Sequence, residues 1–373
     1  MYRRQIESII SDLGNKIVFI VGPRQVGKTW LALEVGKRFD NMTYLNYDSF
    51  EDRQIIKSES WVKSTELLIL DELHKMADWK NYLKGVFDTK PAHLKILVTG
   101  SARLDSFRQA GDSLAGRFFT HRLLPFSIAE LRDDPLSNDI ERFINRGGFP
   151  EPFLAQDEIY AKRWRNQYVD GLVRTDILDF ERIHDFKTMQ TVFELLRRGV
   201  GSPVSFASIA RDTNTSPTTV IKYVRILEAL YIIFRVTPYS RNIGRSVLKE
   251  PKIYFFDNGL IVGDDGAKFE NFVAVSLLKN ILARNDYQGE SLELNYLRTK
   301  DGREVDFCVT DTDRILEAIE AKTHDADISK NLKYFCEKYP VNGVQLVKEL
   351  KREKTIGDIS VLTAQKFLSK LFL

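Results

Sequence analysis

The residues best suited to chemistry lie between Gly22 and Thr29, where the chain reads GPRQVGKT. This spacing of glycine, lysine and threonine is typical of a phosphate-binding loop, or P-loop. Backbone N–H groups of such a loop surround phosphate oxygens, the lysine reaches the terminal phosphates, and the threonine hydroxyl binds Mg²⁺. A chance glycine-rich turn is the alternative, but the apolar run before the motif and the helical pattern after it favour the P-loop. We expect ATP to contact Gly22, Pro23, Arg24, Gln25, Val26, Gly27, Lys28, Thr29 and Trp30.

Two acidic residues, Asp71 and Glu72, follow the apolar run LLIL. A carboxylate at this place can hold Mg²⁺, so we expect Asp71 to share the metal with Thr29, while Glu72 orients and deprotonates the attacking water. Ser101 follows the next apolar run and is placed to sense the γ-phosphate or that water. Two acids after a strand are also common in a solvated turn, but the P-loop upstream favours catalysis by Lys28, Asp71, Glu72 and Ser101.

A second set of residues able to do chemistry lies near the end of the sequence. Glu320 and Lys322 are two positions apart on an expected strand, so both side chains point to one face. Asp306 and Glu320 could hold Mg²⁺, Lys322 could direct a water against a phosphodiester, and Glu270 would add a ligand from a helix. A charged strand face beside a solvated hairpin is the alternative.

The elements that must position the P-loop and its acids alternate between strands and helices. Apolar runs predict strands at residues 17–21, 42–47, 67–70, 94–99 and 118–124. This alternation predicts an α/β fold with a doubly wound parallel sheet, which binds its ligand at the carboxyl ends of the strands. Lys28, Asp71 and Ser101 would meet at that edge.

The middle of the chain has the pattern of a helix-turn-helix. Residues 206–211 form a short expected helix, and Ser216 with Pro217 then marks the start of a second one. Strands are expected at residues 231–236 and 252–256, joined by a basic loop, which together predict a winged helix. Such a module contacts double-stranded DNA or serves only for packing and protein interaction; the side chains available to DNA are Thr218, Lys222, Arg225, Arg241 and Arg245.

The last part of the chain alternates helix and strand in a different order. A helix beginning at Phe269 precedes three expected strands, at residues 292–298, 304–309 and 316–322. A helix at residues 328–337 and a strand at residues 344–347 follow. The pattern predicts a smaller α/β domain.

Composition excludes few functions. The formal net charge is +3, so any nucleic-acid surface must be local. The two cysteines, Cys308 and Cys336, lack metal-type spacing and favour buried, reduced thiols. No apolar run reaches the length that crosses a membrane, and the N-terminus lacks the pattern of a signal peptide. We expect a cytoplasmic protein without a membrane partner.

Four segments together resemble a known family: GPRQVGKT, LLILDELHKMADW, KILVTGSARL and SLAGRFFTHRLLPFSIAEL. They are similar to the AAA-type ATPase domain (AAA_14-like) of a large prokaryotic and archaeal family with a C-terminal domain of the DUF4143 type. The resemblance covers most of residues 1–155. It implies that Arg117 is an arginine finger or a γ-phosphate sensor, although a salt-bridged surface arginine fits the sequence equally well. Arginine supplied by a second copy would require a homo-oligomer.

The set Glu270, Asp306, Glu320 and Lys322 resembles the core of PD-(D/E)xK nucleases. We expect an ATPase domain at residues 1–155, a helical linker and winged helix at 156–265, and a nuclease-like domain at 266–373. The main hypothesis is an ATPase that binds and hydrolyses ATP with Mg²⁺ and is coupled to a DNA-binding winged helix and a nuclease-like domain. The alternatives are a nucleotide-gated DNA- or protein-binding regulator with little turnover, and a Mg²⁺-dependent nuclease regulated by ATP.

Overall fold

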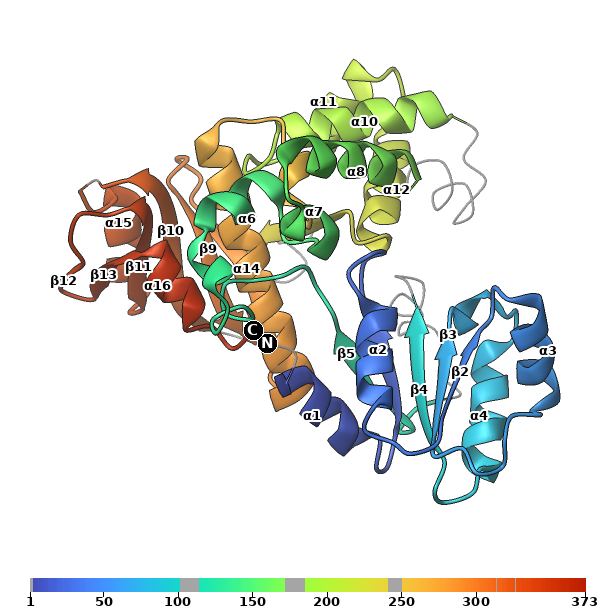
Figure 1. Cartoon of the computed structure of the whole chain (residues 1–373). Helices are drawn as coiled ribbons and strands as arrows, with labels where there is room; N and C mark the ends of the chain where they lie inside the picture. Colours follow the sequence, from blue (N-terminus) through green and yellow to red (C-terminus); the bar gives the residue numbers. More distant parts are fainter. Residues whose placement is uncertain (1–2, 101–113, 172–184, 241–249, 313, 326) are drawn as a thin grey trace. The chain divides into compact units, whose positions relative to one another are not determined.

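The computed structural model describes residues 3–100, 114–171, 185–240, 250–312, 314–325 and 327–373 (Figure 1). It divides into two compact units, Met1–Leu124 and Pro125–Leu373, which we call the N-terminal and C-terminal units. Each unit is described by itself below.

A parallel sheet forms the centre of the N-terminal unit (Figure 1). Its strands follow the order β2-β3-β4-β1-β5, and every pairing between neighbours is parallel. The predicted α/β class and all the expected strands are confirmed, with ends shifted by no more than two residues. The strands are β1 (Ile17–Val21), β2 (Met42–Asn46), β3 (Leu67–Asp71), β4 (Lys95–Gly100) and β5 (Phe118–Arg122).

Helices cover both faces of this sheet, which is why its inner strands are apolar without interruption. β1 and β3 are buried at every position. On one face, Phe19 packs against Trp79 and Phe118, with ring centroids 5.9 and 5.2 Å apart. The helices are α1 (Arg3–Asp12), α2 (Lys28–Gly36), α3 (Phe50–Ser58) and α4 (Trp79–Thr89), with a short 3₁₀ turn, η1 (Leu73–Lys75), after β3.

The C-terminal unit begins with helices. The first are η3 (Pro135–Asn138), α6 (Ile140–Arg146), α7 (Pro150–Leu154) and α8 (Glu158–Gly171). A second group contains α10 (Phe186–Arg198), α11 (Phe206–Asp212) and α12 (Pro217–Ala229). The predicted N-cap of α12 is confirmed, because the Ser216 hydroxyl accepts a hydrogen bond from the Thr219 N–H and Pro217 is the first helical residue.

One mixed sheet joins the expected middle and last domains. Its order is β12-β13-β11-β10-β9-β8-β6-β7. β6 pairs antiparallel with β7 and also parallel with β8, through Thr237–Asn295 and Pro238–Tyr296. The bounds are β6 (Ile233–Pro238), β7 (Lys252–Phe255), β8 (Leu292–Arg298), β9 (Glu304–Asp311), β10 (Arg314–His324), β11 (Asn342–Glu349), β12 (Lys354–Ile356) and β13 (Ile359–Thr363).

Three helices and a turn complete the C-terminal unit: η5 (Asn258–Leu260), α14 (Asp265–Gln288), α15 (Lys330–Lys338) and α16 (Ala364–Ser369). The hairpin of β12 and β13 was not expected from the sequence. Gly357 stands between these strands with φ of 59°, a signature of a tight hairpin turn. Cys308 and Cys336 are free and buried, as expected.

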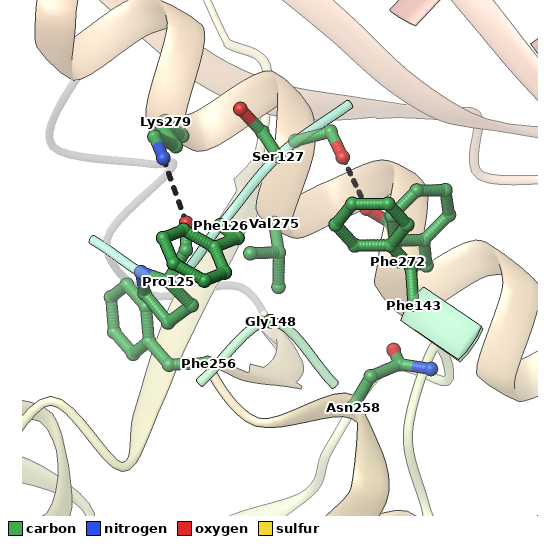
Figure 2. Close-up of a pocket in the computed structure, with 11 residues that line it drawn as sticks. Pro125, Phe126, Ser127, Phe143, Gly148, Phe256, Asn258, Phe272, Val275 and Lys279 are labelled. Atoms are coloured by element: carbon green, nitrogen blue, oxygen red, sulfur yellow. Dashed lines mark hydrogen bonds between the residues drawn. The ribbon is translucent and has the colours of Figure 1, made fainter. Parts of the chain in front are cut away.

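Residues 125–155 pack within the C-terminal unit, although the sequence suggested that they belong to the ATPase domain. Lys279 of α14 donates a 2.8 Å hydrogen bond to the Pro125 carbonyl and forms a buried ion pair with Glu130. Figure 2 shows this lysine beside a small pocket lined by aromatic rings. The ring centroids of Phe143 and Phe272 in this lining are 5.6 Å apart. The two compact units divide at Leu124, and these buried contacts hold the segment to α14; the expected domain bounds stay a prediction.

No helix within the described residues combines the length and the apolar character that crossing a membrane requires.

Candidate functional site

The P-loop connects β1 to α2, as its motif predicts. Gly22 has φ of 150°, and a side chain there would place its Cβ 2.1 Å from the Leu123 carbonyl oxygen, so only glycine fits. α2 begins directly after Gly27. The Lys28 ammonium donates hydrogen bonds to the carbonyls of Gly22 and Pro23, at 3.1 and 2.7 Å. The lysine therefore lies over its own loop, at the place where its motif predicts the terminal phosphates.

Asp71 ends β3 beside the P-loop, and the residue is only 4% exposed. Oδ2 accepts hydrogen bonds of 2.8 Å from the hydroxyls of Thr29 and Tyr44. Oδ1 accepts one from the Thr99 hydroxyl and one of 3.0 Å from the Glu72 N–H. Four donors thus hold a buried carboxylate, which offsets the cost of its burial.

The oxygens of Thr29 and Asp71 fit a magnesium ion. They are hard ligands, one in the first turn of α2 and one at the end of β3, and they already touch each other, so Thr29 could bind Mg²⁺ directly with Asp71 beside it. Tyr44 shares the same carboxylate oxygen; its pKa is raised by burial and by the hydrogen bond to Asp71. Tyr44 and Thr99 were not expected at this site, since each belongs to a neighbouring strand of the sheet.

Glu72 follows Asp71 in a left-handed backbone conformation, with φ of 56°. Its carboxylate lies 3.3 Å from the Lys75 ammonium and 3.7 Å from the His74 ring. Lys75 also pairs with Asp48. The structure therefore places the expected base at the correct strand end and also gives it a cationic partner. Ser101, the other expected catalytic residue of this edge, lies outside the described residues.

Arg117 is not at the P-loop edge of its own sheet. It directly precedes β5, and its carbonyl accepts a 2.9 Å hydrogen bond from the N–H of Ile17 at the start of β1. Both strands run from there towards the P-loop, so Arg117 stands at the opposite, amino edge. Its guanidinium makes two bonds to Asp88, of 2.9 and 3.2 Å. This geometry does not support a γ-phosphate sensor acting within one chain.

The exposed face of α12 carries the expected basic residues. Thr218, Lys222 and Arg225 are exposed, and their spacing of four and three residues places them on one side of the helix. Val220, Val224 and Leu227 are buried on the other side. Of the expected loop residues, Arg241 and Arg245 lie outside the described residues.

The C-terminal acids do come together, but around an unexpected lysine. Lys252 of β7 is 1% exposed, and its ammonium lies 2.8 Å from Glu304, 3.3 Å from Glu270 and 3.7 Å from Asp306. The Tyr254 hydroxyl donates a 2.6 Å hydrogen bond to Glu270. Burial lowers the pKa of Lys252, but the three carboxylates raise it by more than burial lowers it. The net shift of the pKa is upward, so the amine is charged.

Glu320 and Lys322 share a strand face, as their spacing predicts. The Lys322 ammonium lies 2.8 Å from Glu320, and Asp306 accepts a 2.9 Å hydrogen bond from the Ala321 N–H between them. Burial, together with the charge of Asp306, raises the pKa of both Glu270 and Glu320. A lysine at the start of the apolar run KIYFF was the signal for Lys252, because a charged residue on a buried strand requires a partner.

A third buried acid, Asp257, follows β7. It is 1% exposed, and burial raises its pKa to about 6, although the charge of Arg165 opposes the shift. One oxygen accepts a 3.0 Å hydrogen bond from the Gly259 N–H. The other oxygen lies 3.7 Å from Arg165 and accepts no hydrogen bond within the described part of the chain.

Three family models match successive parts of this chain. A model described as "AAA domain" matches residues 14–132. Models described as "Domain of unknown function (DUF8612)" and "Domain of unknown function (DUF4143)" match residues 137–265 and 265–367.

Curated relatives span most of the chain. Uncharacterized protein Rv2008c of Mycobacterium tuberculosis is 28% identical over 332 residues, covering 85% of this chain and 73% of its own length. An uncharacterized protein of Haemophilus influenzae is 27% identical over 376 residues, covering 88% of this chain and 89% of its own length. Uncharacterized protein MJ1544 of Methanocaldococcus jannaschii is 23% identical over 367 residues, covering 89% of this chain and 80% of its own length.

Solved structures with some similarity include the Walker-type ATPase PABY2304 of Pyrococcus abyssi, at 15% identity and a TM-score of 0.46, covering 70% of this chain and 94% of that one. The RuvB Holliday junction branch migration motor of Thermotoga maritima has 17% identity and a TM-score of 0.34, covering 63% and 88%. Successive parts of the chain therefore match an AAA domain, a DUF8612 domain and a DUF4143 domain.

Proposed function

We propose that this protein binds ATP with Mg²⁺, hydrolyses it, and uses the nucleotide to control contact with double-stranded DNA. The observation that carries the proposal is the buried carboxylate of Asp71, which the Thr29 hydroxyl contacts at 2.8 Å directly beside the P-loop. A carboxylate and a threonine held together at the carboxyl ends of parallel strands support a site for a metal-bound triphosphate.

Each residue has a separate part in hydrolysis. The P-loop N–H groups bind the phosphates, and Lys28 moves from its loop carbonyls to the β- and γ-phosphates. Thr29 and Asp71 would hold Mg²⁺, which supplies neutralisation of the charge on the phosphates. Glu72 orients the attacking water and accepts its proton. Ser101, the next residue in the sequence after β4, would hold the γ-phosphate or that water.

Arg117 completes the site only from a second copy of the chain. An arginine at the amino edge cannot reach the P-loop of its own sheet, but it can serve a neighbouring copy in a homo-oligomer. The surface position of the Arg117–Asp88 pair supports this role, because an exposed ion pair contributes little stability and can exchange partners.

The exposed face of α12 is the surface proposed for DNA. The arrangement of α10, α11, α12 and the β6–β7 hairpin is typical of a winged helix, in which the last helix enters the major groove. With Lys222 and Arg225 as its cations, this face supports backbone contact more than base reading.

Turnover tests the proposal most directly. We expect the purified protein to release phosphate from ATP, Lys28→Ala to lose binding or turnover, and Glu72→Gln to bind ATP while losing about 10²-fold or more in rate. Lys37→Ala, an exposed lysine just after α2, is the matched control and keeps full activity. Wild-type turnover by Glu72→Gln would show that the base is wrongly assigned.

The pairing of Glu72 with Lys75 favours a second candidate, a nucleotide-gated binding protein with negligible turnover. The Lys75 ammonium lies 3.3 Å from the Glu72 carboxylate, so the side chain expected to act on the attacking water is engaged in an ion pair. Under this proposal, wild type and Glu72→Gln bind ATP equally and hydrolyse it equally slowly, whereas Lys28→Ala still fails to bind.

A further inference from the structure

The acidic cluster of the C-terminal unit already contains a cation. We use "acidic cluster" for Glu270, Glu304, Asp306 and Glu320. The Lys252 ammonium lies within 3.7 Å of the first three, and its side chain is 1% exposed. An ion surrounded by three carboxylates occupies the place that a divalent metal takes in a carboxylate site.

The remaining charges of the acidic cluster are paired as well. Arg298 lies 3.2 Å from Glu304, and Lys322 lies 2.8 Å from Glu320. Three cations therefore face four carboxylates, so the cluster has little excess negative charge to attract a metal. A divalent ion bound to Glu270 or Asp306 would also stand a few ångströms from the ammonium, which repels it.

The carboxylate oxygens are occupied too. Glu270 Oε1 accepts hydrogen bonds from both Tyr254 and Lys252. Asp306 uses Oδ1 for Lys252 and Oδ2 for the Ala321 N–H. Within the described residues, Glu320 Oε2 is the buried oxygen of the cluster that accepts no hydrogen bond. A metal ion that competed with Lys252 for the cluster would have to bind this oxygen.

The chain also closes over one side of the cluster. Gly201 has φ of 78°, and a Cβ built there would lie 2.9 and 3.0 Å from the two oxygens of Glu270. The turn after α10 therefore rests directly on this carboxylate. Within the described ranges, no three acidic, histidine or cysteine side chains are arranged to hold a metal ion.

We infer that Lys252 is the permanent cation of the acidic cluster, in place of the divalent metal that the nuclease-like residues imply. The cluster then does not bind Mg²⁺ or Mn²⁺, and instead joins β7 to α14 and β9 through buried ion pairs. This inference concerns the C-terminal unit alone and does not depend on ATP hydrolysis.

Mn²⁺ alone, added to the nucleotide-free full-length protein, tests this inference. We expect calorimetry to show no saturable site in wild type at millimolar Mn²⁺. Lys252→Met removes the charge at nearly constant volume, and should bind one Mn²⁺ at least tenfold more tightly than wild type and gain thermal stability from it. Lys322→Met is the matched control, because it removes a cation from the cluster's exposed edge and should gain no site. Adding Asp306→Asn to Lys252→Met should abolish the gain.

Two results would overturn the inference. One is a wild-type site for Mn²⁺ that Asp306→Asn or Glu320→Gln removes, and this measurement needs no lysine variant, so it decides the matter even when Lys252→Met fails to fold. The other is a folded Lys252→Met protein that gains no Mn²⁺ site, which would show that the lysine does not stand in for a metal.

Discussion

The hydroxyl of Thr29 donates a 2.8 Å hydrogen bond to the carboxylate of Asp71, joining the start of α2 to the end of β3. This contact predicts a metal-dependent effect of Thr29 on nucleotide affinity. We expect Thr29→Ala to weaken ATP binding about tenfold or more with Mg²⁺ present, since it removes a metal ligand and a hydrogen bond. Thr29→Ser should bind as wild type does. With EDTA in place of Mg²⁺ the difference should shrink; an equal loss with and without the metal would contradict the assignment.

The donors around Asp71 predict unequal stability losses. Thr99→Val keeps the shape of a buried side chain but leaves Asp71 without one donor, so the free energy of unfolding should fall by about 1–3 kcal/mol. Tyr44→Phe removes another donor at a more exposed place, where water can replace the hydroxyl, and should cost less. Urea unfolding of both variants measures which one loses more free energy of unfolding, and a larger loss for Tyr44→Phe would contradict the prediction.

A role for Arg117 in a second copy predicts complementation. Arg117→Ala should lose about 10³-fold or more in turnover, as expected for an arginine finger. Lys28→Ala retains Arg117 but lacks its own active site. Mixing these two inactive variants should restore activity, because each supplies what the other lacks.

Asp88→Asn provides the control for Arg117. It breaks the surface ion pair and leaves the arginine in place, so its turnover should match wild type. Full activity of Arg117→Ala at every protein concentration would instead show that the Arg117–Asp88 pair has only a structural role.

The burial of Asp257 predicts a pH-dependent stability. Its pKa in the folded protein, about 6, is above the ordinary 3.8, so ionisation is disfavoured by folding. No penalty exists below about pH 4, where both states are protonated, and the penalty grows as the pH rises towards 6. Wild type should therefore lose about 1–3 kcal/mol relative to Asp257→Asn between pH 4 and pH 7. Denaturant unfolding across this range measures it; a difference that does not vary with pH would count against the burial argument.

The exposed face of α12 predicts salt-dependent DNA binding. Removing two phosphate contacts with Lys222→Ala and Arg225→Ala should weaken binding and reduce the slope of log K against log salt by about 1.8. Lys162→Ala with Arg163→Ala removes two exposed cations from α8 and should change neither quantity. Gel shifts over a salt series provide the measurement, and an unchanged slope in the α12 variant would exclude these contacts.

Features encoded by local sequence could be predicted well. The strands of the N-terminal sheet were found because continuous apolar runs such as residues 17–21 mark parallel strands buried on both faces. The P-loop and Asp71 were found because each lies at the end of such a run. The N-cap at Ser216 was also visible, since capping depends on residues three apart.

Features created by distant contacts could not be predicted in the same way. Lys252 meets Glu270 and Glu304 only after β7, α14 and β9 have packed, and no local pattern gives their register. The packing of Pro125 with Lys279 of α14 is similarly remote in sequence. The resemblance included Arg117 among the site residues, but the strand direction of β5 decides which edge of the sheet it occupies.

The position of β6 in the sheet has consequences for how the domains of this protein evolve. This strand pairs with β7 from the DUF8612 region and with β8 from the DUF4143 region. A recombination event that replaced the DUF4143 region alone would leave β6 without its neighbour β8. It would also leave Lys252 without the carboxylates of the acidic cluster. We therefore expect these two regions to be exchanged between lineages as one piece.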